Sequence, residues 1–458
     1  MTIMTEKERL KGILQIAWPL IIANSFWNLQ ITIDRIFLGM FSTEALGAAM
    51  AVMGVFWVPM ALLQQTAGYV TAFVAQYYGA EENEKIGSSV WQSIHVSIIG
   101  GLLFLTLNFA SSWFFSLADH SPSVQALEVE YYNSLAFSAL PTALVAAVSG
   151  FFTGLGKTRT VTLINLTGLI LNVILDYALI FGNLGFPKMG TAGAGYATAI
   201  ATFGAAAFGL ALIFSQENER LYRIRSSWRP DFGLIRQFLR FGLPSGFQWA
   251  LEGLAFTVFL MIMGKMQNGP AVLAASSIAI TVMMLSVLPS MGVAQSVMTL
   301  VGQHLGSHEP EEAEAVTYGG IKLCLIYMTV VGISFYIVPE FYISWFKNEE
   351  NILLWKDTQM LAMQILKLVA IFTAMDSVYF NVSFALKGAG DTRFVSLMAL
   401  TVPWPLFVLP AYLMKDLPNA VFLSWGSVAV YAFIITGILL LRFRGGKWKK
   451  MSVIHPAP

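Results

Sequence analysis

The feature that most constrains this chain is a series of twelve long apolar segments separated by short polar breaks. A helix needs about 20 predominantly apolar residues to cross a bilayer. The segments lie at roughly 13–39, 47–78, 88–117, 126–153, 160–182, 190–215, 236–264, 271–304, 315–346, 357–386, 394–414 and 419–441. The sequence therefore predicts an all-α polytopic membrane protein of twelve transmembrane helices, with no room for a large soluble domain.

The composition excludes several other classes of protein. Apolar residues make up 56% of the chain and charged residues only 12%, whereas soluble domains are about 25% charged. A disordered chain, a disulfide scaffold and a nucleic-acid binder are excluded. The single cysteine, Cys324, lies in an apolar run and is expected to be a small buried residue.

The basic residues predict how the chain is oriented. Residues 1–12 are polar and charged, and the apolar segment after them is longer than a signal peptide requires. Twelve spans place both termini on one side, and that side carries most of the 27 Lys and Arg residues. The positive-inside rule then predicts cytoplasmic termini in the inner (plasma) membrane. The six arginines from Arg220 to Arg240 are expected to anchor this topology, in preference to binding anionic lipid.

The two halves of the sequence resemble each other. Residues Gly154, Gly156, Thr158 and Arg159 recur as Gly388, Gly390, Thr392 and Arg393, Gln76 and Gly79 recur as Gln303 and Gly306, and Pro19 recurs as Pro244. Each copy holds six spans, so the repeat is parallel. We predict a cytoplasmic N-terminus (1–12), an N-lobe (13–215), a basic linker (216–235), a C-lobe (236–441) and a cytoplasmic tail (442–458). Duplicated bundles with the substrate path between their halves are typical of transporters.

The repeated glycines do not form a nucleotide-binding loop. The phosphate-loop pattern requires Gly where this chain has Phe151, and the second copy has Asp391 in place of Lys157. Both copies are predicted to be tight turns in which Gly adopts positive φ. With no sign of an ATPase, we expect an ion gradient to supply the energy and no cofactor to be bound.

Carboxylates inside membrane spans are costly and mark functional sites. Asp34, Asp176 and Thr198 lie at a similar depth, about 9–12 Å from the outer ends of their spans. Asn172 is four residues before Asp176 and shares its helix face. These oxygen-bearing side chains suit Na⁺ or exchangeable protons. The alternative is that Asp34 pairs with Arg35 at the surface.

The second half carries its own acids at different positions. Glu252 and Asp376 lie about 16–18 Å from the inner ends of their spans, near the middle of the membrane. The repeat maps Asp34 onto Phe259, so the two halves are built alike but charged differently. The alternative for Glu252 and Asp376 is a structural, hydrogen-bonded role.

Several motifs together resemble the multidrug and toxic compound extrusion (MATE) transporters, over about residues 10–442. The motifs are IAWPLII, ITIDRIFLG, NVILD, GAGYAT, the two glycine turns before Thr158 and Thr392, and Asp376 ahead of FALKGAGDT. The resemblance implies two six-helix lobes with a central cleft that binds drugs. It also implies that the protein exports cationic, often aromatic, compounds, driven by the inward movement of Na⁺ or H⁺.

The resemblance also implies roles for individual residues. Asp34, Asn172, Asp176 and Thr198 would form the N-lobe cation or proton site, Glu252 and Asp376 would be the C-lobe acids of the NorM-like branch, and Pro19 would let the first span bend. One departure is Phe372, which stands where some relatives carry Tyr.

We therefore predict a secondary antiporter that exports small amphipathic organic cations, acting as a monomer surrounded by lipid. The alternatives in the same superfamily are a lipid-linked saccharide flippase and a metabolite exporter. A flippase would favour a cationic cleft, whereas the charges within these spans are mostly acidic. A membrane-embedded enzyme is disfavoured because neither an HExxH pattern nor a readable Ser/His/Asp set is present. A passive channel stays open as an alternative.

Overall fold

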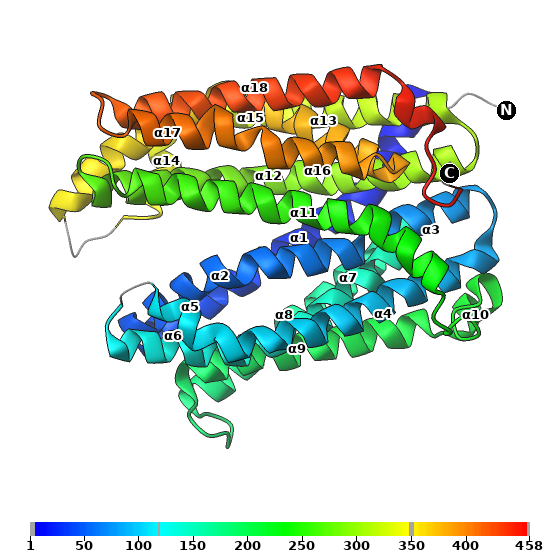
Figure 1. Cartoon of the computed structure of the whole chain (residues 1–458), viewed down its shortest axis with the longest axis horizontal. Coiled ribbons are helices and arrows are strands. Elements are labelled where there is room, and N and C mark those ends of the chain that lie inside the picture. Colours follow the sequence, from blue (N-terminus) through cyan, green and yellow to red (C-terminus); the bar gives the residue numbers. More distant parts are fainter. Residues whose placement is uncertain (1–4, 118–119, 348–351, 456–458) are drawn as a thin grey trace. The chain divides into compact units, whose positions relative to one another are not determined.

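The computed structural model describes residues 5–117, 120–347 and 352–455, and the regular secondary structure within these ranges is helical throughout (Figure 1). The first half contains α1 (Glu6–Phe41), α2 (Thr43–Gly68), α3 (Val70–Gly79), α4 (Ile86–Leu105), α5 (Ser111–Ser116), α6 (Pro122–Leu135), α7 (Ala139–Gly154), α8 (Thr158–Phe181), α9 (Gly190–Ile213) and α10 (Gln216–Tyr222). The second half contains α11 (Phe232–Met263), α12 (Gly269–Gly306), α13 (Pro310–Ile337), α14 (Pro339–Ser344), α15 (Ile352–Ala389), α16 (Thr392–Thr401), α17 (Leu409–Met414) and α18 (Ala420–Arg444).

The predicted membrane spans are confirmed as helices. Eleven helical segments within the described ranges are long and apolar enough to cross a membrane, and they coincide with the second to the twelfth predicted spans. The first predicted span is α1, a helix of 36 residues that also carries polar side chains such as Asn24, Asn28 and Asp34. The chain is thus an all-α multi-pass membrane protein, as predicted.

Five of the predicted spans are interrupted, among them the second and the eleventh. Tyr69 separates α2 from α3, and a π-helical turn at Trp404–Val408 joins α16 to α17. Prolines at 403 and 405 explain the interruption of the eleventh span. Proline has no backbone N–H and cannot complete the α-helical hydrogen-bond pattern, so the backbone changes its pitch locally.

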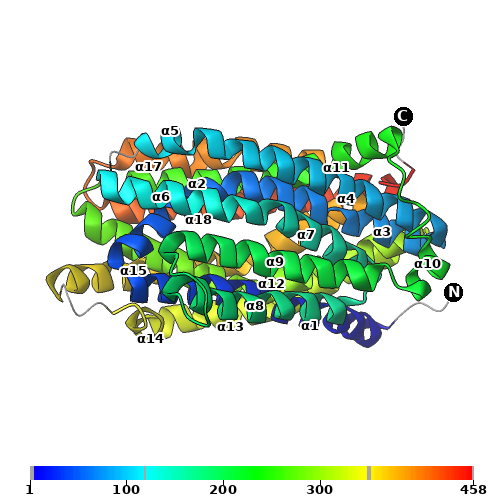
Figure 2. The ribbon, with the colours of Figure 1, turned by 90° about the horizontal axis from the view of Figure 1, so that it is seen from below.

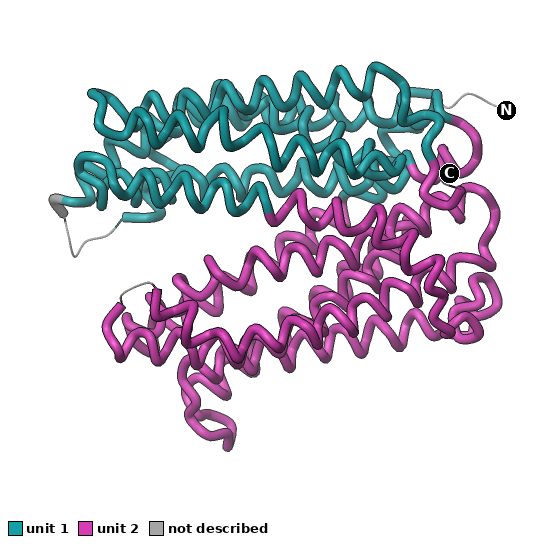
Figure 3. The backbone as a smooth tube through the Cα atoms, viewed as in Figure 1, with its two compact units in different colours: residues 1–17, 251–301, 310–451 teal, residues 18–250, 302–309, 452–458 magenta. Residues whose placement is uncertain are grey.

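The chain forms two compact units (Figure 3). Unit 1 comprises residues 1–17, 251–301 and 310–451, and unit 2 comprises residues 18–250, 302–309 and 452–458. Helices α1, α11 and α12 contribute to both units. The predicted lobe boundaries, which follow the internal repeat, stay a prediction.

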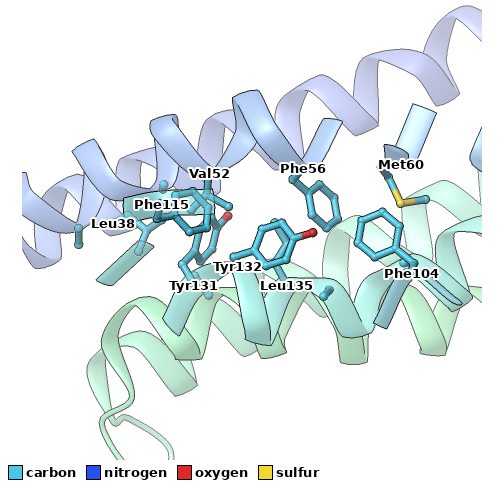
Figure 4. Close-up of a cluster of buried hydrophobic side chains, with 14 of the residues drawn as sticks. Leu38, Val52, Phe56, Met60, Phe104, Phe115, Tyr131, Tyr132 and Leu135 are labelled. Carbon is cyan, nitrogen blue, oxygen red and sulfur yellow. The ribbon is translucent and has the colours of Figure 1, made fainter. Parts of the chain in front are cut away.

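Unit 2 is built from helices that pack around α7 and α9 (Figure 2). Its core contains a cluster of buried aromatic side chains contributed by α2, α4, α5 and α6 (Figure 4). The ring of Phe56 lies 5.2 Å from that of Phe104 and 6.2 Å from that of Tyr132, centroid to centroid. These edge-on contacts hold α6 against α2, which places the next turns of α6 beside the candidate site described below.

Unit 1 is centred on α15, which packs against α13 and α18. The Arg442 side chain at the end of α18 donates two hydrogen bonds to the Asp391 carboxylate, at 2.7 and 3.2 Å. Asp391 precedes α16, so this paired contact fixes where α16 begins.

The two repeated glycine turns have the predicted backbone. Gly156 has φ of +73° and Gly390 has φ of +102°, a region that other residues rarely adopt. The next helices, α8 and α16, begin at the threonines two residues later. The interpretation of both copies as tight turns is confirmed.

Within unit 2, the ends of α3 and α12 make close contact through a second set of repeated residues. These are Gln76 and Gly79 in the first copy and Gln303 and Gly306 in the second. A Cβ atom at Gly79 would lie 1.9 Å from the backbone oxygen of Gln303, and one at Gly306 would lie 2.1 Å from the backbone oxygen of Gln76. The Ser307 hydroxyl donates to the Gly79 carbonyl at 2.9 Å. The ends of α3 and α12 therefore touch backbone to backbone, and each copy of the repeat supplies one glycine.

Replacing either glycine by alanine is expected to destabilise the protein. In Gly79→Ala and Gly306→Ala the new methyl group meets backbone atoms that cannot move aside, at a cost of about 1–3 kcal/mol. The measurement is the thermal stability of the purified protein in detergent. Gly54→Ala is the control, because it lies within α2 with nothing within 4 Å of its Cβ position. Equal stability of all three variants would contradict the close contact.

Candidate functional site

Three helices of unit 2 bring the predicted N-lobe residues together. Asp34 comes from α1, Asn172 and Asp176 lie one turn apart on α8, and Thr198 comes from α9. The side chains of Asn172 and Asp176 are fully buried, and Asp34 is 8% exposed. Residues from distant parts of the sequence thus form one cluster, as their similar depths predicted.

An amide group bridges the two carboxylates. With its nitrogen facing them, Asn172 donates to Asp34 Oδ1 at 2.8 Å and to Asp176 Oδ2 at 3.1 Å. The other side of the amide lies 3.4 Å from the Thr198 hydroxyl, which can donate to the amide oxygen. The two carboxyl groups also lie within hydrogen-bonding range of each other.

The pair of acids needs a positive partner. Asp176 Oδ1 is buried and receives no hydrogen bond from a described residue. Among the described residues, no salt bridge is formed by Asp34 or Asp176, although Arg35 acts on Asp34 at longer range. Two ionised carboxylates this close repel each other, so the cluster suits a proton or a small cation. The surface pairing of Asp34 with Arg35, considered above, is not observed.

The GAGYAT motif brings α9 close to its neighbours. A Cβ atom at Gly193 would lie 2.7 Å from the Leu179 backbone of α8, and one at Gly195 would lie 2.0 Å from the Ser134 side chain of α6. Only glycine permits these contacts. Because α9 approaches so closely, Thr198, one turn further along, reaches the carboxylate cluster.

An apolar pocket opens beside Asp34. Its aromatic walls include Trp27 and Trp57, whose rings lie 6.5 Å apart, centroid to centroid. The pocket is lined by Trp27, Gln30, Ile31, Asp34, Arg35, Leu38, Ala49, Met53, Phe56, Trp57, Met60, Tyr131, Leu135, Ser138, Thr142 and Thr198. Flexible Met and flat aromatic side chains accept ligands of varied shape. Sequence reasoning did not single out Trp27 or Trp57.

The second-half acids lie in unit 1 in a different environment. The Tyr379 hydroxyl donates to the Glu252 carboxylate. Lys387 is 2% exposed, lies 4.1 Å from the centre of the Phe384 ring, and is close enough to Glu252 to be influenced by its charge. Glu252 therefore has a cationic side chain nearby. The N-lobe acids differ, because neither Asp34 nor Asp176 forms a salt bridge with a described residue.

Asp376 lies on the same helix as these partners. It is partly buried, and Tyr431 of α18 is within electrostatic reach of both Asp376 and Glu252. Sequence reasoning singled out neither Lys387 nor Tyr379. One signal was available for Tyr379, since it follows Asp376 by three residues and so shares its helix face. Tyr379 provides a phenol hydroxyl near the acids of this half. Phe372, which stands where some relatives carry Tyr, has no hydroxyl to offer.

The proximity of Glu252 and Lys387 predicts a measurable coupling. Lys387 is buried and Glu252 is partly buried. Glu252→Gln or Lys387→Met alone removes one of two opposite charges and leaves the other unpaired, so the double variant should lose less stability than the two singles together. We expect a coupling of about 1 kcal/mol or more in a double-mutant cycle of thermal stability.

The exposed pair Lys449 and Glu311, at 2.9 Å, gives a matched control cycle. Its coupling should be at most about 0.5 kcal/mol, because solvent screens it. A Glu252–Lys387 coupling no larger than that of the control would show that these two charges do not interact.

The fold and the site together define a class of protein. A duplicated set of apolar helices, with buried acids and an adjoining apolar pocket, defines a membrane transporter. A family model described as MatE matches residues 19–178 and again residues 244–413. The two matches begin at Pro19 and Pro244, the prolines paired by the internal repeat. The chain therefore belongs to the MatE family of transporters.

Individual relatives agree with this assignment. The chain is 29% identical to the probable multidrug resistance protein NorM of Thermotoga maritima over 97% of its length and 94% of the relative. It is 28% identical to the multidrug resistance protein PmpM of Pseudomonas aeruginosa, over 87% of this chain and 82% of the relative. The predicted resemblance to the NorM-like branch is confirmed, and so is the prediction that the chain is a transporter rather than an enzyme.

A solved structure confirms the fold. It is described as the outward-facing conformation of a multidrug resistance MATE family transporter, and it matches with a TM-score of 0.87 over 97% of each chain at 20% identity. The predicted twelve-helix, two-lobe architecture agrees with this match.

Proposed function

We propose that this multidrug efflux transporter exports amphipathic organic cations in exchange for Na⁺ or H⁺. The observation that carries the proposal is the buried Asp34–Asp176 pair beside an apolar, aromatic pocket. Asp34 belongs both to the carboxylate cluster and to the pocket lining. A cation or proton on Asp34 and an organic cation in the pocket would compete for the same negative charge, which couples the two movements.

The Asn172 amide lets the cluster hold either coupling ion. With its N–H groups directed at the carboxylates, it stabilises two acids that share a proton. With its oxygen directed at them, it adds the oxygen ligand that Na⁺ prefers.

We assign the coupling ion to the N-lobe cluster. Glu252 already has Lys387 close by and accepts a hydrogen bond from Tyr379. A further cation at Glu252 would compete with this internal ammonium group. Asp376 is the C-lobe acid that we propose as a second exchange site.

Pro19 would provide the bend that the N-lobe needs to change conformation. It lies inside α1, beside the boundary between the two compact units at Ala17 and Trp18. Its carbonyl accepts a hydrogen bond from the Thr162 hydroxyl at 2.8 Å, which ties this point of α1 to α8. We further propose that the transporter is a monomer of the inner (plasma) membrane with both termini in the cytoplasm.

The proposal is tested by efflux of a cationic dye from proteoliposomes. Ethidium efflux is measured under an imposed pH gradient and, separately, under an imposed Na⁺ gradient. We expect efflux under at least one of the two gradients, which identifies the coupling ion. Asp34→Asn should reduce it about tenfold, in line with coupling free energies of about 1–3 kcal/mol.

Glu44→Gln serves as the control, because it neutralises an exposed acid at the start of α2. Efflux under the Na⁺ gradient alone would assign the coupling to Na⁺, and efflux under the pH gradient alone would assign it to H⁺. Normal efflux by Asp34→Asn would rule out this acid as the coupling site. The absence of dye efflux under both gradients would favour the lipid-linked saccharide flippase or the metabolite exporter.

A further inference from the structure

The stretch of unit 2 that joins α9 to α11 carries an excess of positive charge. Residues 216–240, called the basic segment below, contain six arginines, three acids and no lysine. The segment connects the candidate membrane spans Gly190–Ile213 and Phe232–Met263, so it lies where the chain leaves one span and enters the next. The sequence predicts a topology anchor here, and the structure adds how the side chains are placed.

The backbone of the basic segment is fixed to α4. Figure 1 shows α10, the first part of the segment, at the end of unit 2 where α4 begins. The Trp91 indole N–H donates to the Ile224 carbonyl. The Gln92 side chain donates to the Arg229 carbonyl at 3.5 Å and accepts from the Asp231 N–H at 3.2 Å. A segment held in this way loses little conformational freedom when a partner binds it.

Three of the six arginines already have a partner within the protein. These are Arg223 with Glu84 at 2.7 Å, Arg225 with the Phe214 carbonyl at 2.8 Å, and Arg240 with the Phe241 ring at 5.8 Å. The other three, Arg220, Arg229 and Arg236, are exposed. Their side chains make no hydrogen bond, ion pair or ring contact with another described residue. Three positive charges on a fixed segment are therefore available to an external partner.

The acids of the segment do not neutralise these three arginines. The Glu219 carboxylate accepts a hydrogen bond from the backbone N–H of Arg225. The Asp231 carboxylate accepts one from the Leu234 N–H at 3.0 Å, at the start of α11. Both acids are thus used to fix the backbone of the segment, and neither forms a salt bridge with the available arginines.

Exposed aromatic side chains accompany the available arginines. Trp228 is 55% exposed, and Phe232, the first residue of α11, is 81% exposed. Tryptophan and phenylalanine are stabilised at the boundary between lipid headgroups and acyl chains. Arginine next to this boundary meets the phosphates of the headgroups. Exposed aromatic and basic side chains in one segment are typical of a surface that lies against a membrane.

We propose that the basic segment is a binding site for anionic phospholipid. Arg220, Arg229 and Arg236 pair with the headgroups, and Trp228 and Phe232 lie at the boundary of the acyl chains. Guanidinium donates two parallel hydrogen bonds to a phosphate. A zwitterionic headgroup offers the same phosphate but adds a cation that the arginines repel. A lipid is favoured over an acidic protein as the partner because both ends of the segment continue into membrane spans.

The test compares two lipids with identical acyl chains, the anionic dioleoylphosphatidylglycerol and the zwitterionic dioleoylphosphatidylcholine. Native mass spectrometry counts the molecules of each lipid that bind to the purified full-length protein in detergent. The wild type should prefer phosphatidylglycerol. The triple variant Arg220→Gln, Arg229→Gln, Arg236→Gln should bind it at least about tenfold more weakly, because each arginine near an anionic surface contributes about fivefold. Its affinity for phosphatidylcholine should change little.

Two further variants separate a specific site from general electrostatic attraction and from misfolding. Replacement of the same three arginines by lysine keeps the charge, and lysine binds phosphate as a point charge, so most of the preference for phosphatidylglycerol should remain. The charge-matched control is the triple variant Lys7→Gln, Lys11→Gln, Lys447→Gln, which removes three exposed charges outside the basic segment. It should keep the affinity for phosphatidylglycerol within about twofold of the wild type, because no available arginine is lost.

The outcomes bear on this inference alone, because it is independent of the substrate and the coupling ion. Equal affinity of the wild type for the two lipids would overturn it. An equal loss of phosphatidylglycerol binding in the arginine-to-glutamine and control triples would overturn it too, and so would an equal loss in the lysine and glutamine variants. A selective loss in the arginine-to-glutamine variant would support it, whatever the result of ethidium efflux.

Discussion

The arrangement of unit 2 around its site depends on one unfavourable interaction, the close approach of two carboxylates inside an apolar bundle. Asp34 and Asp176 are held together by the Asn172 amide and by the helices that carry them. Electrostatic repulsion opposes this arrangement unless positive charge arrives. The aromatic core around Phe56 and Tyr132 and the close packing of α9 supply the stability that keeps the acids in place. A site that is strained when empty is sensitive to its occupant, which is the property an exchanger requires.

Much of this fold could be predicted from the sequence, because a chain that crosses a bilayer must satisfy its backbone hydrogen bonds within long apolar helices. The helices follow from apolar length, and the repeat follows from matching residues such as Pro19 and Pro244. The positive φ of Gly156 and Gly390 follows from local backbone sterics. The N-lobe cluster could also be predicted. Asp34, Asp176 and Thr198 lie at one depth in the membrane, where few polar partners are present other than these residues themselves.

Other parts of the site depend on contacts that no local pattern encodes. Lys387 follows the end of an apolar run and has the sequence context of an exposed residue, yet it is buried near Glu252. The Trp27–Trp57 pair joins two helices whose relative rotation is set by packing. The direction of the Asn172 amide depends on its hydrogen-bond partners alone. Each of these features required the tertiary structure.

The reciprocal contact between the ends of α3 and α12 bears on how such a chain arises. Gly79 faces the backbone of Gln303, and Gly306 faces the backbone of Gln76. Contacts in which residue i touches j while j touches i are those of a two-fold symmetric dimer. A shorter ancestral gene encoding one six-span copy would already carry both partners of this contact. Two such copies would pair through it, and gene fusion would preserve the interface without inventing a new one.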